Sequence, residues 1–251
     1  MTEYAYQLYS SRDFPPLEET LAMLSDLGYR RTEGYGGMLA DPPAVRAAHD
    51  AAGLVMGSVH LGLDDLRADC DGMIRVAEVL GVSSVYAPHL AESERPADAA
   101  GWTALAHELE TLAGAFDAAG LHFGWHNHDF EFRPTAGGAV PMELILEAAP
   151  SIGWEADIAW IVRGGADPFD WIARLGHRAT AVHIKDIAPA GECADEDGWA
   201  DVGHGTMDWG RLLTALEEFP VRHFIVEHDR PNDDRRFARR SLETLNALTR
   251  S

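Results

Sequence analysis

The stretch His122–Asp129, with the sequence HFGWHNHD, decides the fold class because an aromatic-rich run ends there in polar side chains. Aromatic residues favour a β-strand, so the run up to Trp125 is expected to be one. The residues that follow include His126 and His128, and imidazoles bind metals and exchange protons near neutral pH. The stretch therefore predicts a strand that presents reactive side chains at its carboxyl end.

Three later segments repeat this pattern of an apolar run that ends in charged or imidazole side chains. They are Ile152–Asp157, Ala181–Asp186 and Phe224–Asp229. In (β/α)8 barrels the reactive groups come from the carboxyl ends of several different strands. The repetition therefore indicates one reaction centre built by four successive strands.

Strand-like and helix-like segments alternate along the chain. The expected strands are Ala5–Tyr9, Arg31–Tyr35, Val55–His60, Ser83–Ala87, Leu121–His126, Gly153–Ile158, Thr180–Ile184 and His223–Glu227. The expected helices are Pro16–Leu27, Asp41–Ala52, Asp65–Leu80, Asp98–Ala119, Pro141–Ala149, Asp167–Leu175, Asp208–Phe219 and Asp233–Leu248. This alternation predicts an α/β protein with a single (β/α)8 TIM-barrel domain over residues 1–251. A doubly wound open sheet is the competing architecture, but Gly34–Gly37 does not fit the GxGxxG pattern that such sheets often carry. The longest loop, Ala188–Gly205, is expected to cover the active site.

The chain is strongly acidic, with 41 Asp and Glu against 20 Lys and Arg among its 251 residues and a formal charge of −21. Such a charge repels polyanions, so we expect no nucleic-acid partner. Cys70 and Cys193 suggest no disulfide framework, and we expect neither a secretory signal nor a membrane span. The composition therefore predicts a cytoplasmic protein that does not bind nucleic acid.

Strand alternation places one ligand-type residue from each of the four segments on the inner face of the barrel. These residues are His126, Asp157, His183 and Glu227. Two imidazoles with two carboxylates suit Mn, Co, Fe, Ni or Zn better than Ca. A lone His at a strand end is more often a hydrogen-bonded packing residue, but four such clusters favour a metal site.

Other polar side chains are candidates for the substrate pocket. They are His60, His89, His204 and Glu33, with a surface role as the alternative for Glu33. Lys185 beside a metal centre would hold a substrate oxygen or stabilise an enolate. The alternative for Lys185 is a salt bridge with Asp186 or a neighbouring carboxylate.

At these residues the chain resembles the xylose-isomerase-like TIM-barrel superfamily and, within it, the proteins called sugar phosphate isomerase/epimerase. The resemblance covers nearly the whole chain and rests mainly on HNHDFEF at 126–132, HIKD at 183–186 and VGHGTMDW at 202–209. It implies a carbohydrate substrate and a divalent metal at the carboxyl mouth of the barrel, with Mn²⁺ expected first and Mg²⁺, Co²⁺ or Zn²⁺ as alternatives. It also implies isomerase or epimerase chemistry, in which a proton beside a carbonyl is removed through a metal-stabilised enolate.

The resemblance also implies residue roles. Asp157, His183 and Glu227 match metal ligands of the family, and Glu227 also matches a proton-exchanging glutamate. Glu131 resembles a glutamate that contacts substrate. The sequence departs from the family at the first ligand position, where His126, or arguably the pair His126 and His128, replaces a glutamate.

We therefore assign the metal to the four residues named above, with His126 on the fifth strand. The catalytic candidates are His128, Glu131, Lys185 and Glu227. The His-rich strand end also resembles carbon-oxygen or carbon-carbon lyases of the superfamily, namely inosose dehydratases and enzymes that eliminate the aglycone from 3-keto-glycosides or C-glycosides. DNA repair, on the related AP endonuclease barrel, is disfavoured by the acidic charge. A non-catalytic binding subunit remains a further alternative, and a homo-oligomer or a partner subunit is an open expectation.

Overall fold

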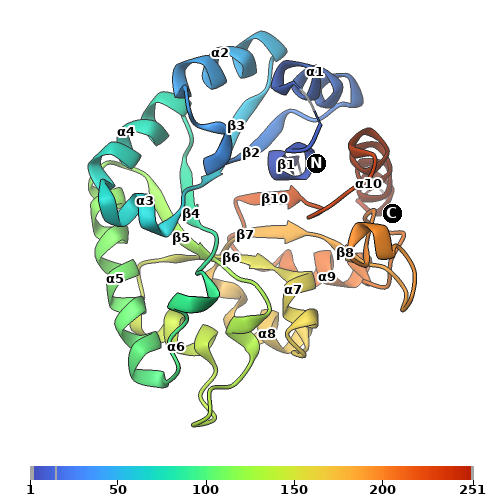
Figure 1. Cartoon of the computed structure of the whole chain (residues 1–251). Helices are drawn as coiled ribbons and strands as arrows, with labels where there is room; N and C mark the ends of the chain where they lie inside the picture. Colours follow the sequence, from blue (N-terminus) through green and yellow to red (C-terminus); the bar gives the residue numbers. More distant parts are fainter. Residues whose placement is uncertain (1–2, 15, 250–251) are drawn as a thin grey trace.

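The computed structural model describes residues 3–14 and 16–249, and within them eight parallel strands close into a barrel (Figure 1). The strands are β1 Tyr4–Gln7, β2 Arg31–Tyr35, β3 Val55–His60, β4 Ser84–Ala87, β5 His122–His126, β6 Gly153–Asp157, β7 Ala179–Ile184 and β10 His223–Val226. The barrel closes where β1 pairs with β10, with Tyr4 opposite Phe224. The predicted (β/α)8 barrel is confirmed.

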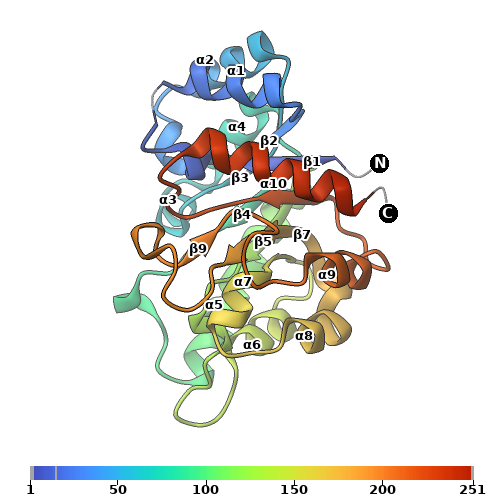
Figure 2. The same cartoon turned by 90° about the vertical axis from the view of Figure 1, so that its right-hand side faces the viewer.

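Helices surround the barrel on its outside (Figure 1). They are α1 Leu17–Leu27, α2 Pro42–Ala52, α3 Leu63–Ala68, α4 Cys70–Leu80, α5 Ala99–Ala118, α6 Pro141–Ala148, α7 Ile158–Arg163, α8 Pro168–Leu175, α9 Trp209–Leu216 and α10 Asp234–Leu248. Aspartates cap several of them; for example, Asp98 and Asp208 accept hydrogen bonds from backbone N–H groups of the first turn. Each such cap stabilises its helix by about 1 kcal/mol. Figure 2 shows α10 lying along the outside of the barrel beside β1. Among the described residues, the helices are all too short or too polar to cross a lipid bilayer.

One expected helix is two helices. The prediction of a single helix over Asp65–Leu80 is wrong because Asp69 adopts an extended backbone, with φ −153° and ψ 75°, between α3 and α4. The Asp69 side chain then accepts a hydrogen bond from Gly72 N and caps α4. The helical spacing of apolar residues continues across Asp69, so this spacing alone predicted one uninterrupted helix.

A short helix, α7, and a pair of two-residue strands, β8 and β9, were not expected. The chain turns directly from β6 into α7, and Asp157 caps that helix by accepting a hydrogen bond from Trp160 N at 2.9 Å. The predicted long loop contains β9, Trp199–Ala200, which pairs antiparallel with β8, Asp186–Ile187.

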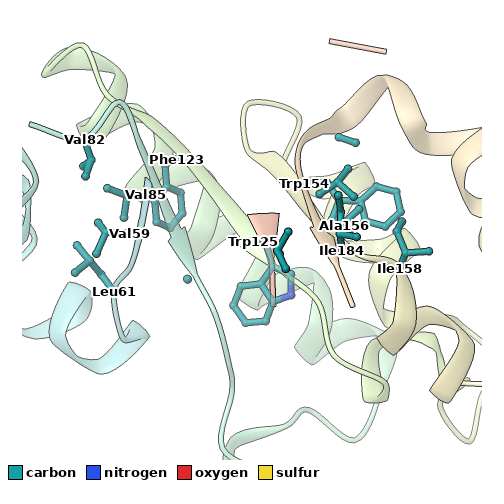
Figure 3. Packing of buried hydrophobic residues seen from close by; sticks show 14 of the residues in the cluster. Val59, Leu61, Val82, Val85, Phe123, Trp125, Trp154, Ala156, Ile158 and Ile184 are labelled. Atoms are coloured by element: carbon teal, nitrogen blue, oxygen red, sulfur yellow. The ribbon is translucent and has the colours of Figure 1, made fainter. Parts of the chain in front are cut away.

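The main core lies between the strands and the helices. Trp125 and Trp154 point outward from β5 and β6 and are fully buried there (Figure 3). Burying one such side chain stabilises the fold by about 1.5–3 kcal/mol or more. The barrel interior has its own small apolar layer, formed by Ala5, Tyr86, Ala181 and Ile225. The carboxyl half of the interior, beyond this layer, is filled by polar side chains.

Candidate metal centre

The four predicted ligands come together at the carboxyl ends of β5, β6, β7 and β10. One ligand atom of each of His126, Asp157, His183 and Glu227 lies within 4.8 Å of the others, and all four residues are buried. We call these residues the mouth set. The strand register explains the assembly, since Asp157 of β6 lies directly opposite His183 of β7. The geometry fits the predicted ligand set, and metal occupancy remains a prediction.

Asn127 fixes the position of Asp157. Its side-chain oxygen accepts hydrogen bonds from Asp157 N at 3.1 Å and from Trp154 Nε1 at 2.7 Å. Its side-chain nitrogen donates to Asp157 O at 3.1 Å. Asn127 therefore ties the end of β5 to the end of β6, which explains why an amide stands between the two histidines of the HNH sequence.

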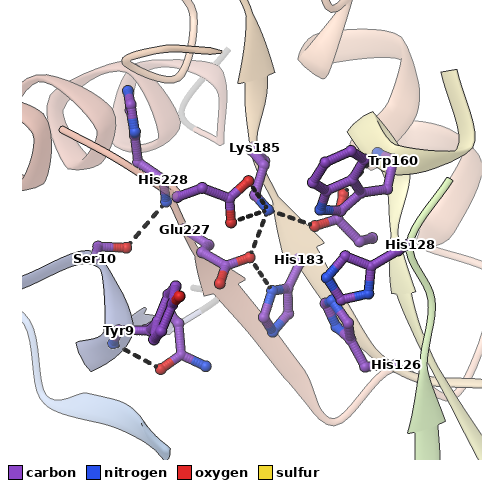
Figure 4. A network of polar contacts seen from close by, with 12 residues as sticks. Tyr9, Ser10, His126, His128, Trp160, His183, Lys185, Glu227 and His228 are labelled. Carbon is purple, nitrogen blue, oxygen red and sulfur yellow. Dashed lines mark hydrogen bonds and ion pairs between the residues drawn. The ribbon is translucent and has the colours of Figure 1, made fainter. Parts of the chain in front are cut away.

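Lys185 is buried among carboxylates (Figure 4). Its Nζ lies 2.8 Å from Glu227 Oε2, 3.0 Å from Asp157 Oδ2 and 3.0 Å from Asp229 Oδ1. Burial favours the neutral amine, but these carboxylates raise the pKa of Lys185 above its usual range, so the side chain is a cation at neutral pH. Lys185 is not among the residues that line the cavity described below, and its contacts support the ion-pair interpretation rather than direct enolate stabilisation.

The partner of Lys185 is not Asp186. The Asp186 carboxylate instead accepts hydrogen bonds from Gly203 N at 2.8 Å and Met207 N at 3.0 Å. These bonds hold the loop that follows β9 against the end of β7. Of the two charged residues in the HIKD sequence, Lys185 therefore pairs with carboxylates of the site, and Asp186 holds a loop.

A second group of ligand-type residues lies one layer deeper in the barrel. It consists of His60, His126, Glu155 and His183, whose ligand atoms also lie within 4.8 Å of one another. We call these residues the deep set. Glu155 precedes Asp157 by two residues on β6, so strand alternation alone places both on the inner face. Glu155 had no predicted role, because one ligand was taken from each strand end and Asp157 was the residue taken on β6.

Glu33 borders the deep set. A surface position was the alternative expected for this residue, but it is fully buried. It accepts hydrogen bonds from Gln7 Nε2 at 2.8 Å and from the Ser58 hydroxyl, and it lies 2.7 Å from His183 Nε2. The barrel interior therefore holds two carboxylates at the depth of Glu155.

The histidines of the site differ in charge. Burial and the neighbouring His183 lower the pKa of His126, so its imidazole is neutral and has a free electron pair for a metal. Burial opposes protonation of His60 as well, but Glu33 and Glu155 raise its pKa to about 10. In the metal-free protein His60 therefore supplies a positive charge that these two carboxylates need.

Glu131 supports the end of β5 from behind. It is fully buried and accepts hydrogen bonds from Trp125 Nε1 at 3.0 Å and His128 N at 2.9 Å. Burial raises its pKa to about 8. It is not among the residues that line the cavity, so the predicted direct contact with substrate is not what its position supports. The structure instead gives Glu131 a role in positioning His128.

His128 itself faces the cavity. Its Nδ1 is buried and has no hydrogen-bond partner among the described residues. Burial and the nearby Lys185 lower the pKa of His128, so the imidazole is neutral. Its ring centroid lies 5.1 Å from that of His126. A neutral imidazole beside a metal-ligand set is suited to accept a proton.

A cavity of about 660 Å³ opens at the carboxyl end of the barrel above these groups. Its lining includes His60, His89, His126, His128, Glu227, Asp229, Tyr9, Arg12, Tyr35 and Asp197. His60 and His89 line this cavity, and their role in binding substrate stays a prediction. Asp197 brings the long loop to the cavity. His204 is not in the lining; its Nδ1 instead lies 2.7 Å from Arg240 Nη2.

The donor chemistry fits a divalent ion. Five buried or nearly buried carboxyl groups converge on this end of the barrel, and they are Glu33, Glu155, Asp157, Glu227 and Asp229. Lys185 supplies one permanent positive charge for them. One oxygen of Glu155, Oε1, is buried without a hydrogen-bond partner among the described residues. Because buried carboxylates are costly unless they are paired or coordinated, a divalent cation would balance this site.

Comparison with known proteins places the chain in a family. The family model described as Xylose isomerase-like TIM barrel matches residues 21–248. The chain belongs to this family. No curated protein matches the sequence significantly.

Solved structures with the same fold are similar over almost the whole chain. A sugar phosphate isomerase/epimerase from Parabacteroides distasonis has a TM-score of 0.80 and 21% identity, covering 98% of this chain and 93% of that one. The probable 3-DHS dehydratase AsbF from Bacillus anthracis has a TM-score of 0.76 and 11% identity, covering 98% and 99%. The IOLI protein with a zinc atom has a TM-score of 0.76 and 17% identity, covering 99% and 96%. At these low sequence identities, the similarity to the solved structures shows that the fold is shared and does not show a shared activity.

Proposed function

We propose that this protein is a divalent-metal-dependent isomerase or epimerase that removes a proton from the carbon beside a carbonyl group of a sugar or keto-sugar. The observation that carries the proposal is the mouth set, of which His126 and Glu227 line the cavity together with the neutral imidazole of His128. Family membership and the similar fold of a sugar phosphate isomerase/epimerase support it. A carbohydrate is the expected small-molecule partner because the cavity lining is mainly polar and aromatic.

The mouth set would hold the ion, and Mn²⁺ is our first choice because two carboxylates and two imidazoles suit it. Mg²⁺, Co²⁺ and Zn²⁺ are alternatives, and a zinc atom is bound in the similar IOLI structure. When bound, the ion would supply Lewis acidity that polarises the substrate carbonyl and acidifies the adjacent C–H bond.

Proton movement is assigned to His128 and Glu227. His128 accepts the proton at its neutral imidazole, because this side chain lines the cavity. Glu227 also lines the cavity; burial disfavours its anion, but Lys185 and His183 hold its pKa below its usual range, so it is a carboxylate. The two residues come from β5 and β10, which are separated in the barrel by β6 and β7. Groups on different sides of a substrate are what an epimerase needs to remove a proton from one face and return it to the other.

Lys185 and Glu131 position these groups. Lys185 forms ion pairs with Asp157 and Glu227. It helps to hold the pKa of Glu227 below its usual range, and it opposes the rise in pKa that burial causes at Asp157. Glu131 fixes the backbone of His128 through its hydrogen bond to His128 N. Neither residue needs to contact substrate in this scheme.

A lyase of the same family is the second candidate, and Asp229 is the observation that favours it. Burial raises the pKa of Asp229 to about 6, although Lys185 acts in the opposite direction. Asp229 lines the cavity, so its carboxyl group is placed to donate a proton to a leaving group. The cavity volume is in the range that encloses drug-sized ligands, which leaves room for a substituent beyond one sugar ring.

The test is incubation of the metal-loaded protein with ketoses, inososes and 3-keto-glycosides in D₂O, followed by NMR. Deuterium at the carbon beside the carbonyl, together with an isomer, is the expected result for the isomerase or epimerase. An enone or a released aglycone would replace that proposal with the lyase. The variant His128→Asn should lose exchange, whereas His122→Asn, at the amino end of the strand that precedes His128, should keep it. Metal bound without turnover or exchange across the panel would contradict both enzymes.

A further inference from the structure

We propose that the barrel contains a second, deeper metal position, formed by His60, His126, Glu155 and His183, which takes a nitrogen-preferring divalent ion such as Co²⁺ or Zn²⁺. The mouth set serves the proposed reaction, whereas this position is defined by metal binding alone. It overlaps the mouth set because His126 and His183 belong to both. The chemical type of the ion therefore decides which of the two positions it occupies.

Three imidazoles converge on one carboxylate oxygen in the deep set. Glu155 Oε2 lies 2.5 Å from His60 Nε2, 3.1 Å from His126 Nδ1 and 3.5 Å from His183 Nε2. The ring centroids of His126 and His183 are 4.5 Å apart, and that of His60 lies 5.0 Å from His126. Nitrogen atoms from three different strands thus lie within 3.5 Å of one carboxylate oxygen in the barrel interior, so the four side chains are close enough together to bind one ion.

A dication would balance the charge of this layer. Glu33 and Glu155 are both fully buried, and the ion pairs of Lys185 are with Asp157, Glu227 and Asp229. A divalent ion would offset both carboxylates and leave all three imidazoles neutral, with their electron pairs free to coordinate it. It would also provide a partner for Glu155 Oε1, which is buried and without a hydrogen-bond partner among the described residues.

The donor atoms of the two sets differ in type. The deep set offers three nitrogens and one carboxylate, and the mouth set offers two of each. Imidazole-rich sets select Zn²⁺, Co²⁺, Ni²⁺ or Cu²⁺, whereas oxygen-rich sets suit Mn²⁺ and Mg²⁺. His183 faces both sets, since its Nδ1 lies 2.7 Å from Glu227 and its Nε2 lies 3.5 Å from Glu155. A single ring can therefore serve either position by a different nitrogen.

The test is titration of the metal-free full-length protein with Co²⁺, followed by visible absorption, and with Mn²⁺, followed by electron paramagnetic resonance. His60→Ala and the nearly isosteric Glu155→Gln should weaken Co²⁺ binding at least about 10-fold and change its visible bands. Both variants should bind Mn²⁺ within about 3-fold of the unaltered protein. Glu227→Gln should show the reverse pattern.

His122→Ala is the matched control, because it removes an inward imidazole of β5 at the other end of the barrel; it should leave both affinities unchanged. Circular dichroism identifies any variant that fails to fold. If His60→Ala does not fold, the test rests on Glu155→Gln. Unchanged Co²⁺ affinity and bands in a folded Glu155→Gln or His60→Ala protein would overturn the proposal. The proposal would also be overturned if Glu227→Gln weakened the binding of Co²⁺ and Mn²⁺ equally while the variants of His60 and Glu155 weakened neither. Because no substrate is used, failure of the proposed reaction would leave this result standing, and the converse also holds.

Discussion

The two ends of the barrel interior carry the same types of residue and use them differently. On β5, His122 lies at the amino end and His126 lies at the carboxyl end. His122 Nε2 is 3.1 Å from the hydroxyl of Thr180, and His223 Nε2, at the amino end of β10, is 3.2 Å from the hydroxyl of Ser84. His126 instead faces Glu155 and two further histidines.

The difference shows which end of the barrel needs a cation. Neutral hydroxyl groups satisfy the histidines at the amino end without any charge. The carboxyl end concentrates carboxylates around one lysine, which leaves an excess of buried negative charge. A histidine at a strand end is therefore a structural residue or a ligand depending on its neighbours across the barrel, and not on its own position in the strand.

Loss of His183 is expected to have the largest effect, because this residue belongs to both ligand sets. Substitutions near a metal that spare its ligands already cost 10- to 100-fold, so His183→Ala should reduce metal-dependent turnover by about 10³-fold. Steady-state kinetics with metal analysis checks this result. His223→Ala, on the adjacent strand β10 at the amino end, should retain activity within about 3-fold. Similar losses in both variants would erase the distinction between the two ends.

The buried ion pairs of Lys185 should be worth far more than a surface pair. Lys185→Met leaves Asp157, Glu227 and Asp229 unpaired in the interior, and the free energy of unfolding should fall by about 3–5 kcal/mol. Arg174→Ala is the comparison, since Arg174 pairs with Asp170 and Glu143 on the surface, where water screens the charges, so its loss should lower the free energy of unfolding far less. Urea denaturation measures both values. Equal destabilisation would mean that the carboxyl end is not a charge-dense interior.

Metal removal should destabilise the protein only when the ligands at the carboxyl end of the barrel are intact. At an ion concentration 100 times the dissociation constant, bound metal adds about 2.7 kcal/mol to the free energy of unfolding. For a chain of this length that corresponds to a fall in Tm of about 5–10 °C on chelation. Scanning calorimetry with and without chelator checks it. The same fall is expected in His122→Gln, while in His183→Ala chelation should change Tm by no more than about 1 °C.

In the metal-free protein, the histidines at the two ends of the barrel should make the free energy of unfolding depend on pH with opposite signs. Glu33 and Glu155 raise the pKa of His60 to about 10 against the opposing effect of burial, so its stabilising contribution is complete below about pH 6.5 and is lost as pH rises toward 10. Burial and Arg222 lower the pKa of His122 to about 4, so stability is lost there as pH falls from about 6.5 to 4. Each histidine would contribute a slope of at most about 1.4 kcal/mol per pH unit.

Unfolding measured across this range in two variants separates the ends. His60→Gln should flatten the alkaline limb, and His122→Gln should flatten the acid limb. A variant that flattened the limb assigned to the other histidine would show that the two environments are misassigned.

The sequence was sufficient to predict the barrel and much of the site. Asp caps and apolar runs fixed most element boundaries to within a residue or two, and the expected ranges of β2 and β3 match the structure. Alternation along β6 and β7 also predicted that Asp157 and His183 face inward, where they lie opposite each other. These features depend on residues that are close together in the sequence, so they can be predicted from the sequence alone.

The remainder depends on distances across the barrel. Glu33 of β2 meets His183 of β7 only after the strands close, and no spacing in the sequence encodes that contact. The buried position of Glu131 depends on the turn after β5, which directs its carboxylate to Trp125 instead of the cavity. Asp69 breaks a helix by backbone conformation while the apolar pattern runs on unchanged.

The most direct test of the central claim is anomalous diffraction at the manganese edge from crystals of the Mn²⁺-loaded protein. The account predicts one strong peak among His126, Asp157, His183 and Glu227 at the carboxyl end of the barrel interior. A protein saturated with Mn²⁺ that shows no peak there, or peaks on its surface alone, would contradict it.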